Sequence, residues 1–121
     1  MDKTTLVLGA SPNPERFSYK AIARLQRKKI PIIAIGRRDA DIGNLKIIKG
    51  IPDNIGYVHT VSMYMSAKNQ KEFYDYIFSL HPKRIIFNPG TINPELADAA
   101  RKKGIEVIED CMIVMLNTGQ F

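Results

Sequence analysis

Short apolar segments alternate with segments of helical periodicity along nearly the whole chain. The apolar segments are residues 4–8, 32–35, 57–64, 84–87 and 105–108, with residues 46–49 as a short additional candidate. Continuous apolar runs of this length predict strands buried on both faces. Strands that alternate with helices are typical of a parallel sheet covered on both sides. The pattern therefore predicts an α/β, three-layer, Rossmann-like fold: a doubly wound parallel sheet of about five strands in the order 3-2-1-4-5.

Helices are expected over residues 19–29, 67–80, 94–103 and 111–116, between and after the strands. Ser18 and Ser66 are predicted N-caps, because their hydroxyls can accept hydrogen bonds from the first free N–H groups. Asn93-Pro94-Glu95 is a stronger helix start, and Gly104 predicts a left-handed stop. Residues 37–55 are expected to be mostly irregular.

The length of the chain limits its organisation to one domain, residues 1–121. This is too short for a dinucleotide domain with a separate substrate domain. The single cysteine, Cys111, excludes an internal disulfide and fits a reducing compartment. No apolar run approaches the roughly 18 residues that span a bilayer, and no signal peptide is apparent. A cytoplasmic location without a membrane partner is therefore expected.

The chain is basic, with a net charge of +6. A positive balance favours anionic partners such as nucleic acids or phosphorylated small molecules, although it also serves solubility. No nucleic-acid motif and no interleaved basic and aromatic stretch is present, so no nucleic-acid partner is expected. The longest basic run, residues 27–29, falls at a predicted helix end and complements the helix dipole there.

The loop after the first strand is the first candidate site, because ligands of doubly wound sheets bind beyond the carboxyl ends of the strands. The expected switch point lies between strands 1 and 4. Gly9 is the only glycine of this loop, which therefore departs from the G-x-G-x-x-G dinucleotide pattern. Ser11 and Ser18 offer hydroxyls, Pro12 stiffens the loop, and Arg16 can chelate phosphate oxygens. A phosphate-binding loop is predicted, with a proline-rich surface loop as the alternative.

Gly36, Arg37 and Arg38 follow the second strand, where an NAD-binding domain would carry an acidic residue for the ribose. Two arginines there favour a phosphorylated ribose, either the 2′-phosphate of NADP or the 3′-phosphate of coenzyme A (CoA). Two solvated loop arginines are the alternative. The loops at Tyr64 and at residues 88–90 are expected on the same rim.

Catalytic groups are sparse. His59 and His81 are not expected to meet, and no pair of Cys or His has metal-ligand spacing. Glu109 and Asp110 are adjacent on a strand end and should point to opposite faces. A non-catalytic binding module is therefore expected. The alternative is a minimal NADP(H)-binding protein or reductase whose substrate surface is completed by dimerisation.

Two stretches carry a family resemblance: "GASPNPERFSY" (residues 9–19) and "FNPGTINPELADAARKKGIEVIED" (residues 87–110), followed by Cys111. Together they resemble the small stand-alone CoA-binding proteins. Those proteins are similar to the CoA-binding domain of the succinyl-CoA synthetase α-subunit and of ADP-forming acyl-CoA synthetases. The resemblance spans nearly the whole chain. It implies a Rossmann-like domain with CoA or acyl-CoA across the first loop and the end of strand 2.

The resemblance also implies roles for particular residues. Gly9, Ala10 and Ser11 would contact the pyrophosphate; Arg16, Ser18 and Tyr19 would close the loop over it. Residues 36–38 would meet the adenosine and its 3′-phosphate. The full predicted site is Gly9, Ala10, Ser11, Pro12, Arg16, Ser18, Tyr19, Gly36, Arg37, Arg38, Tyr64, Asn88, Pro89 and Gly90.

The chain also departs from the family pattern in two loops. Residues 36–38 replace the usual Asn-Pro pair after strand 2, and Asn88-Pro89-Gly90 replaces a Gln-Leu-Gly type of sequence after strand 4. The first departure bears on the adenine contacts, and the second bears on the pocket around the pantetheine arm. The phosphohistidine of the synthetases belongs to another domain, and this chain does not contain it. The resemblance implies the CoA ligand as the partner, with a homodimer or a separate enzyme as further possibilities.

Overall fold

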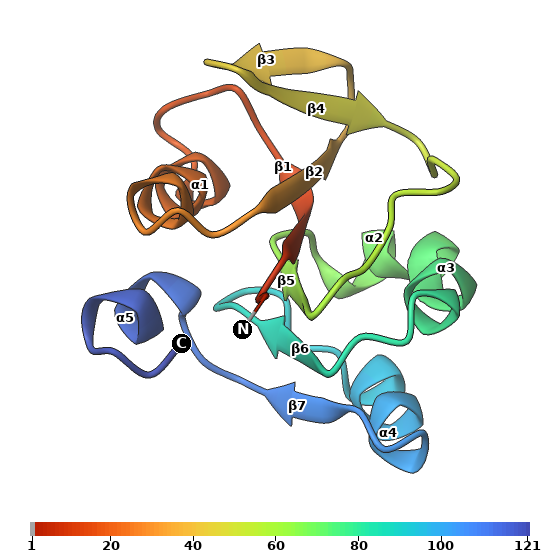
Figure 1. The fold of residues 1–121 in the computed structure, drawn as a ribbon. Coiled ribbons are helices and arrows are strands. Elements are labelled where there is room, and N and C mark those ends of the chain that lie inside the picture. Colours follow the sequence, from red (N-terminus) through yellow and green to blue (C-terminus); the bar gives the residue numbers. More distant parts are fainter. Residues whose placement is uncertain (1) are drawn as a thin grey trace.

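A seven-stranded sheet with helices on both faces forms the centre of the computed structural model, which describes residues 2–121 (Figure 1). The strands lie in the order β3-β4-β2-β1-β5-β6-β7, and only the β3–β4 pair is antiparallel. The strands are β1 (Thr5–Ala10), β2 (Ile32–Gly36), β3 (Ala40–Ile42), β4 (Leu45–Lys49), β5 (Thr60–Met63), β6 (Arg84–Phe87) and β7 (Glu106–Ile108). The helices are α1 (Phe17–Arg27), α2 (Ala67–Gln70), α3 (Tyr74–Ser79), α4 (Pro94–Lys102) and α5 (Met112–Asn117), with a 3₁₀ turn, η1 (Lys71–Phe73), between α2 and α3.

The predicted α/β class is confirmed, but the predicted number and order of strands are wrong. The segment expected at the outer side of β2 instead forms β5, which pairs with β1 from Thr5↔Thr60 to Leu8↔Met63. Strand β4 fills the place beside β2, in the register Ala34↔Ile47. A hairpin explains the difference. Strand β3 is antiparallel to the strand that follows it, β4, so β4 runs parallel to β2 without a crossover helix between them. The switch point therefore lies between β1 and β5.

The core consists of two apolar layers, one on each face of the sheet. Leu6 and Leu8 of β1 face one way and Val7 the other, as the period of a strand requires. The layer that contains Leu6 and Leu8 is covered by η1, α3 and α4. The layer that contains Val7 is covered by α1 and α5, which lie together on the other face (Figure 1). Burial on both faces explains why the strands are short apolar runs.

The helix starts agree with the sequence at α4 and differ at α1. Asn93 caps α4, its Oδ1 accepting a hydrogen bond from Leu96 N at 3.2 Å, and Pro94 is the first helical residue. Gly104 follows α4 with a φ of 79°, as predicted. Helix α1 begins at Phe17, so Arg16 is its N-cap and Ser18 is buried in the first turn. The predicted capping role of Ser18 is therefore wrong.

The helix predicted over residues 67–80 is broken into α2, η1 and α3. Gln70 ends α2 and is fully buried. Its Nε2 donates to the carbonyl oxygens of Met65 at 2.9 Å and of Thr91 at 2.7 Å. These bonds hold the last residue of α2 against two loops at the carboxyl edge of the sheet, while Phe73 enters the core beyond the break.

Candidate functional site

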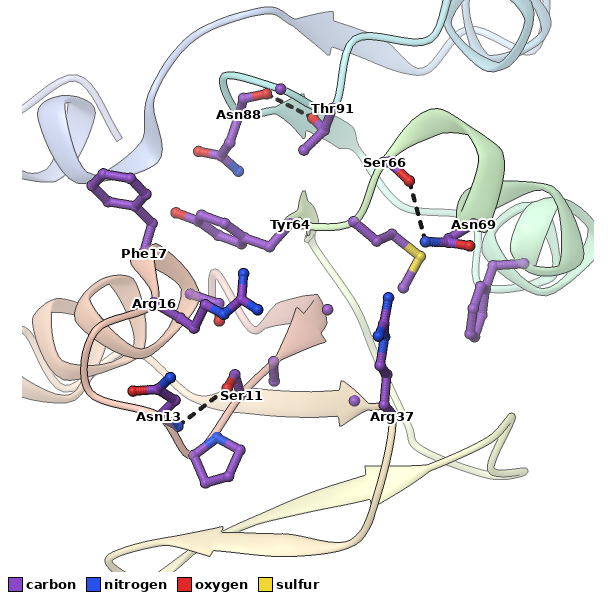
Figure 2. Close-up of a pocket in the computed structure, with 18 of the residues that line it drawn as sticks. Ser11, Asn13, Arg16, Phe17, Arg37, Tyr64, Ser66, Asn69, Asn88 and Thr91 are labelled. Carbon is purple, nitrogen blue, oxygen red and sulfur yellow. Dashed lines mark hydrogen bonds between the residues drawn. The ribbon is translucent and has the colours of Figure 1, made fainter.

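A cleft of about 1340 Å³ lies at the carboxyl ends of β1, β2, β4, β5 and β6 (Figure 2). The loops from both sides of the β1–β5 switch point line it, as the fold class requires. Every predicted site residue except Tyr19 lines this cleft: Gly9, Ala10, Ser11, Pro12, Arg16, Ser18, Gly36, Arg37, Arg38, Tyr64, Asn88, Pro89 and Gly90. Tyr19 instead packs against the apolar layer beneath α1.

Gly9 brings the first loop directly against the loop after β5. Its φ is +96°, and a Cβ at this position would lie 2.7 Å from both the carbonyl carbon and oxygen of Tyr64. Only glycine permits this conformation and this approach together. The two loops therefore meet backbone to backbone at the switch point, which a side chain at residue 9 would prevent.

The first loop is held by its own hydrogen bonds. Ser11 Oγ accepts from Asn13 N at 3.1 Å, and Asn13 Oδ1 accepts from Glu15 N at 3.0 Å. The Asn13 carbonyl also accepts from Arg16 N at 3.0 Å. Successive turns of this kind, together with Pro12, give the loop a defined path. The loop therefore delivers Arg16 to the edge of the cleft without a glycine-rich sequence.

The N-terminus of α1 faces the cleft, because Arg16, Phe17 and Ser18 all line it. Among residues 2–121, no side chain caps this helix, and its first turn carries no acidic residue. The first N–H groups of an α-helix lack intrahelical acceptors, and the helix dipole adds a partial positive charge. This end of α1 therefore has the donors and the electrostatic character of an anion-binding site.

Cationic side chains gather at the α1 and β2 side of the cleft. Among the described lining residues they are Arg16, Arg37, Arg38 and Lys49, against two carboxylates, Glu15 and Glu72. Figure 2 shows Arg16 and Arg37 entering the cleft from different loops. The positive charges are therefore concentrated around the first loop and the ends of β2 and β4.

Lys49 was not among the predicted site residues. It ends β4, and the parallel register Gly36↔Lys49 brings it to the same rim as the two arginines. Its backbone N–H donates to Asp39 Oδ1 at 3.0 Å, which ties β4 to the segment that follows Arg37 and Arg38. Residues 46–49 were recognised as a candidate strand. The position of Lys49 at the rim, however, follows only when this strand is placed beside β2.

Gly36 has a packing function. A Cβ there would lie 2.3 Å from the Ala10 carbonyl oxygen and 2.8 Å from Cγ2 of Ile47. The end of β2 therefore fits between β1 and β4 only because it lacks a side chain. This close packing holds the arginines that follow it near the first loop.

Asn88 joins three elements beneath the cleft and is almost completely buried. Its Nδ2 donates to Ser62 Oγ at 3.0 Å and to the Met63 carbonyl at 2.8 Å, both on β5. Its Oδ1 accepts from Met112 N at 2.8 Å, at the start of α5. The side-chain amide is thus engaged within the protein, and Asn88 positions the loop that carries Pro89 and Gly90.

Tyr64 lies in the middle of the cleft, between Asn88 and Arg16 (Figure 2). Its hydroxyl is buried and has no hydrogen-bond partner among residues 2–121. Burial raises the pKa of the phenol. The hydroxyl is therefore protonated at neutral pH, and it is enclosed by the protein while the ring lines the cleft.

The described lining residues include no histidine, and Cys111 lies at the far end of the cleft, half-buried. Within residues 2–121, no three His, Cys, Asp or Glu side chains cluster so that they could hold a metal ion. In the same range, no helix has both the length and the apolar character needed to cross a membrane. The cleft offers cations, hydroxyls and backbone donors, which suit the binding of an anionic ligand.

Residues 3–117 match the family model described as a CoA binding domain. The chain belongs to this family. The match agrees with the resemblance found in residues 9–19 and 87–110, and it makes a CoA-type ligand the expectation for the cleft. Nothing in the comparisons supports the NADP alternative.

Solved structures similar to this CoA binding domain share its whole architecture. A crystal structure of an uncharacterised protein is 42% identical, with a TM-score of 0.94, covering 100% of this chain and 99% of its own. A hypothetical protein from Pyrococcus horikoshii OT3 is 19% identical, with a TM-score of 0.87 over 97% of this chain and 83% of its own. A Thermus thermophilus structure is also 19% identical, with a TM-score of 0.87 over 99% and 91%. The last two support the fold alone, and no match to a curated protein was found.

Proposed function

We propose that this chain binds CoA or an acyl-CoA along the cleft, as a binding module without a catalytic site of its own. The observation that carries the proposal is the uncapped N-terminus of α1, which faces a cleft whose neighbouring walls carry Arg16, Arg37, Arg38 and Lys49. CoA has phosphate groups at two places, and the concentrated cations suit such a ligand.

The pyrophosphate would lie on the first loop. Gly9 lets this loop pack against the loop after β5, and the first N–H groups of α1 supply neutral donors. Arg16 would add a charged fork to the phosphate oxygens. The structure of the loop, held by Ser11 and Asn13, reduces the ordering that binding would require.

The adenosine and its 3′-phosphate would lie at the ends of β2 and β4. Arg37 and Arg38 follow β2, and Lys49 ends β4 beside them. An NAD-binding domain would carry an acidic residue for the unmodified ribose at the end of β2. Here neither β2 (Ile32–Gly36) nor the next two positions, which are Arg37 and Arg38, supply one. The cationic cluster instead supports recognition of the 3′-phosphate.

The pantetheine arm would run from the first loop past Tyr64 and over Pro89 and Gly90. Neighbouring strands are spaced by ~4.8 Å, so the four spacings from β4 to β6 give an edge of about 19 Å for an extended ligand. The side chain of Tyr64 lies along this path, where the arm would pack against it. The thiol would then reach the end of the cleft at Cys111.

Calorimetric titration with CoA, dephospho-CoA and NADPH tests the proposed ligand. CoA is expected to bind more tightly than dephospho-CoA by about 1–3 kcal/mol, because the latter lacks the phosphate assigned to the arginines. Exchange of both Arg37 and Arg38 for alanine should remove most of that difference. The double variant Arg27→Ala with Lys28→Ala, at the far end of α1, is the charge-matched control. Binding of NADPH alone would reject the proposal.

The variant Arg16→Ala tests the first loop separately. Its affinity for CoA is expected to fall by about 1–3 kcal/mol, the cost of losing a charged hydrogen bond. Dephospho-CoA should lose the same amount, since it retains the pyrophosphate. Arg27→Ala, which removes one positive charge from the last turn of α1, should leave both affinities unchanged. An unchanged CoA affinity in Arg16→Ala would mean that Arg16 does not contact the phosphates.

A further inference from the structure

A second, smaller hollow of about 230 Å³ adjoins the cleft at the end farthest from the arginines. It lies between the loops that follow β6 and β7 and is lined by Phe87, Pro89, Ile92, Glu109, Asp110 and Cys111. Pro89 and Cys111 line both the hollow and the cleft. The hollow therefore continues the line of the cleft by one strand, from β6 to β7.

We propose that this hollow receives the acyl chain of a CoA thioester and selects for chains without a terminal carboxylate. The inference rests on the proposed CoA function, because the thiol end of the ligand must reach Cys111. The phosphates fix the direction of the ligand, since the cations lie around the first loop and the ends of β2 and β4. The thioester end then points toward the hollow.

The walls of the hollow suit a small apolar group. Phe87 is fully buried in the core beneath the hollow, while Ile92 is 45% exposed and forms part of the rim. An isoleucine this exposed leaves apolar surface that a ligand chain can cover. A volume of about 230 Å³ compares with the roughly 30 Å³ that a water molecule occupies in the liquid. The space therefore accommodates a chain of a few carbons.

The charge of the hollow is opposite to that of the cleft. Its described lining residues include two carboxylates, Glu109 and Asp110, and no cation. The expectation that these two side chains point to opposite faces is wrong, because β7 ends at Ile108 and both residues lie beyond the strand. Asp110 Oδ1 accepts from Cys111 N at 2.7 Å, which holds this carboxylate beside the place where the hollow meets the cleft. Two carboxylates that line the hollow would repel a third carboxylate placed in it. A butyryl group should therefore be accepted and a succinyl group, with the same number of carbons, should be disfavoured.

Calorimetry with CoA, butyryl-CoA and succinyl-CoA tests this selection on the intact chain. Butyryl-CoA is expected to bind about tenfold more tightly than CoA, because three carbons are buried beyond the carbonyl. Succinyl-CoA is expected to bind at least about tenfold more weakly than butyryl-CoA. Because both thioesters share the CoA part, their ratio is independent of the phosphate contacts. Equal binding of all three ligands would overturn the inference and leave the proposed CoA function standing.

Two variants locate the effect. The double variant Glu109→Gln with Asp110→Asn should reduce the ratio of butyryl-CoA affinity to succinyl-CoA affinity by about fivefold or more. The amide oxygen of the new Asn can still accept from Cys111 N. Ile92→Trp should fill the rim and abolish the butyryl advantage while CoA affinity stays unchanged. Val114→Trp is the control, at an equally exposed apolar position on α5 that lines neither hollow. An unaltered ligand ratio in both test variants would contradict the inference, and absence of CoA binding in the parent chain would reject the proposed function itself.

Discussion

Gly9→Ala is expected to lower the free energy of unfolding by about 2–6 kcal/mol, the combined scale of backbone strain and overpacking. The φ of +96° strains any residue with a Cβ, and the new methyl group would meet the Tyr64 carbonyl group at 2.7 Å. Since both contact atoms belong to the backbone, β1 and β5 would have to separate at the switch point. Urea unfolding followed by circular dichroism measures the change.

Gly56→Ala separates the two causes. Gly56 also has a positive φ, +84°, but a Cβ there would meet no atom within 4 Å. This control should therefore show only the conformational cost, on the order of 1 kcal/mol. Equal losses of unfolding free energy in the two variants would mean that the close contact at Gly9 adds nothing to the cost. The backbone approach between the two loops would then not contribute to stability.

Asn88→Ala is the second large effect, with an expected loss of about 2–5 kcal/mol of unfolding free energy. The substitution would leave the Met63 carbonyl and the Met112 N–H without their partner in a buried place, and each unsatisfied group costs roughly 1–3 kcal/mol. The measurement is urea unfolding as above. The exposed Asn44→Ala, in the β3–β4 turn, should change stability by less than about 0.5 kcal/mol.

Asn88→Asp distinguishes the lost donor from the lost volume. The new carboxyl keeps an acceptor for Met112 N, but its ionised form has no donor for the Met63 carbonyl. Burial should raise its pKa above the unfolded value of about 3.9. The protonated form can donate again, so this variant should lose stability relative to the parent chain as pH rises through its folded pKa. A difference from the parent that does not vary between pH 4 and pH 8 would contradict this account of the Asn88 contacts.

Much of the fold could be predicted because local signals and tertiary structure agree. The buried strands around Val7, Ile35 and Ile86 are apolar runs, and α4 carries its Asn93 cap and Gly104 stop in the sequence. The strand order could not be predicted, because it depends on which segment pairs with β2. Ile47 fills that position from a segment with weak strand signals, and only its packing reveals this.

The candidate site was predictable for a related reason. The loops after β1, β2 and β5 are marked by Gly9, Arg37 and Tyr64, and any doubly wound order brings strand ends to one edge. Lys49 was missed because its strand was not placed there. The burial of Gln70 and the break after it were missed as well, because hydrogen bonds to Met65 and Thr91 come from distant loops. The helical periodicity of residues 67–80 contains no trace of those partners.

The two edges of the sheet restrict how another protein can associate with this one. Each edge strand, β3 and β7, is only three residues long, and exposed Asp41 on β3 lies opposite Lys46 on β4. Short edges with charged side chains discourage pairing with a strand from another molecule. A protein that associates with this one is therefore expected to contact its helices or the cleft rim and not its sheet edges. Growth of fibres by edge-to-edge strand addition is correspondingly disfavoured.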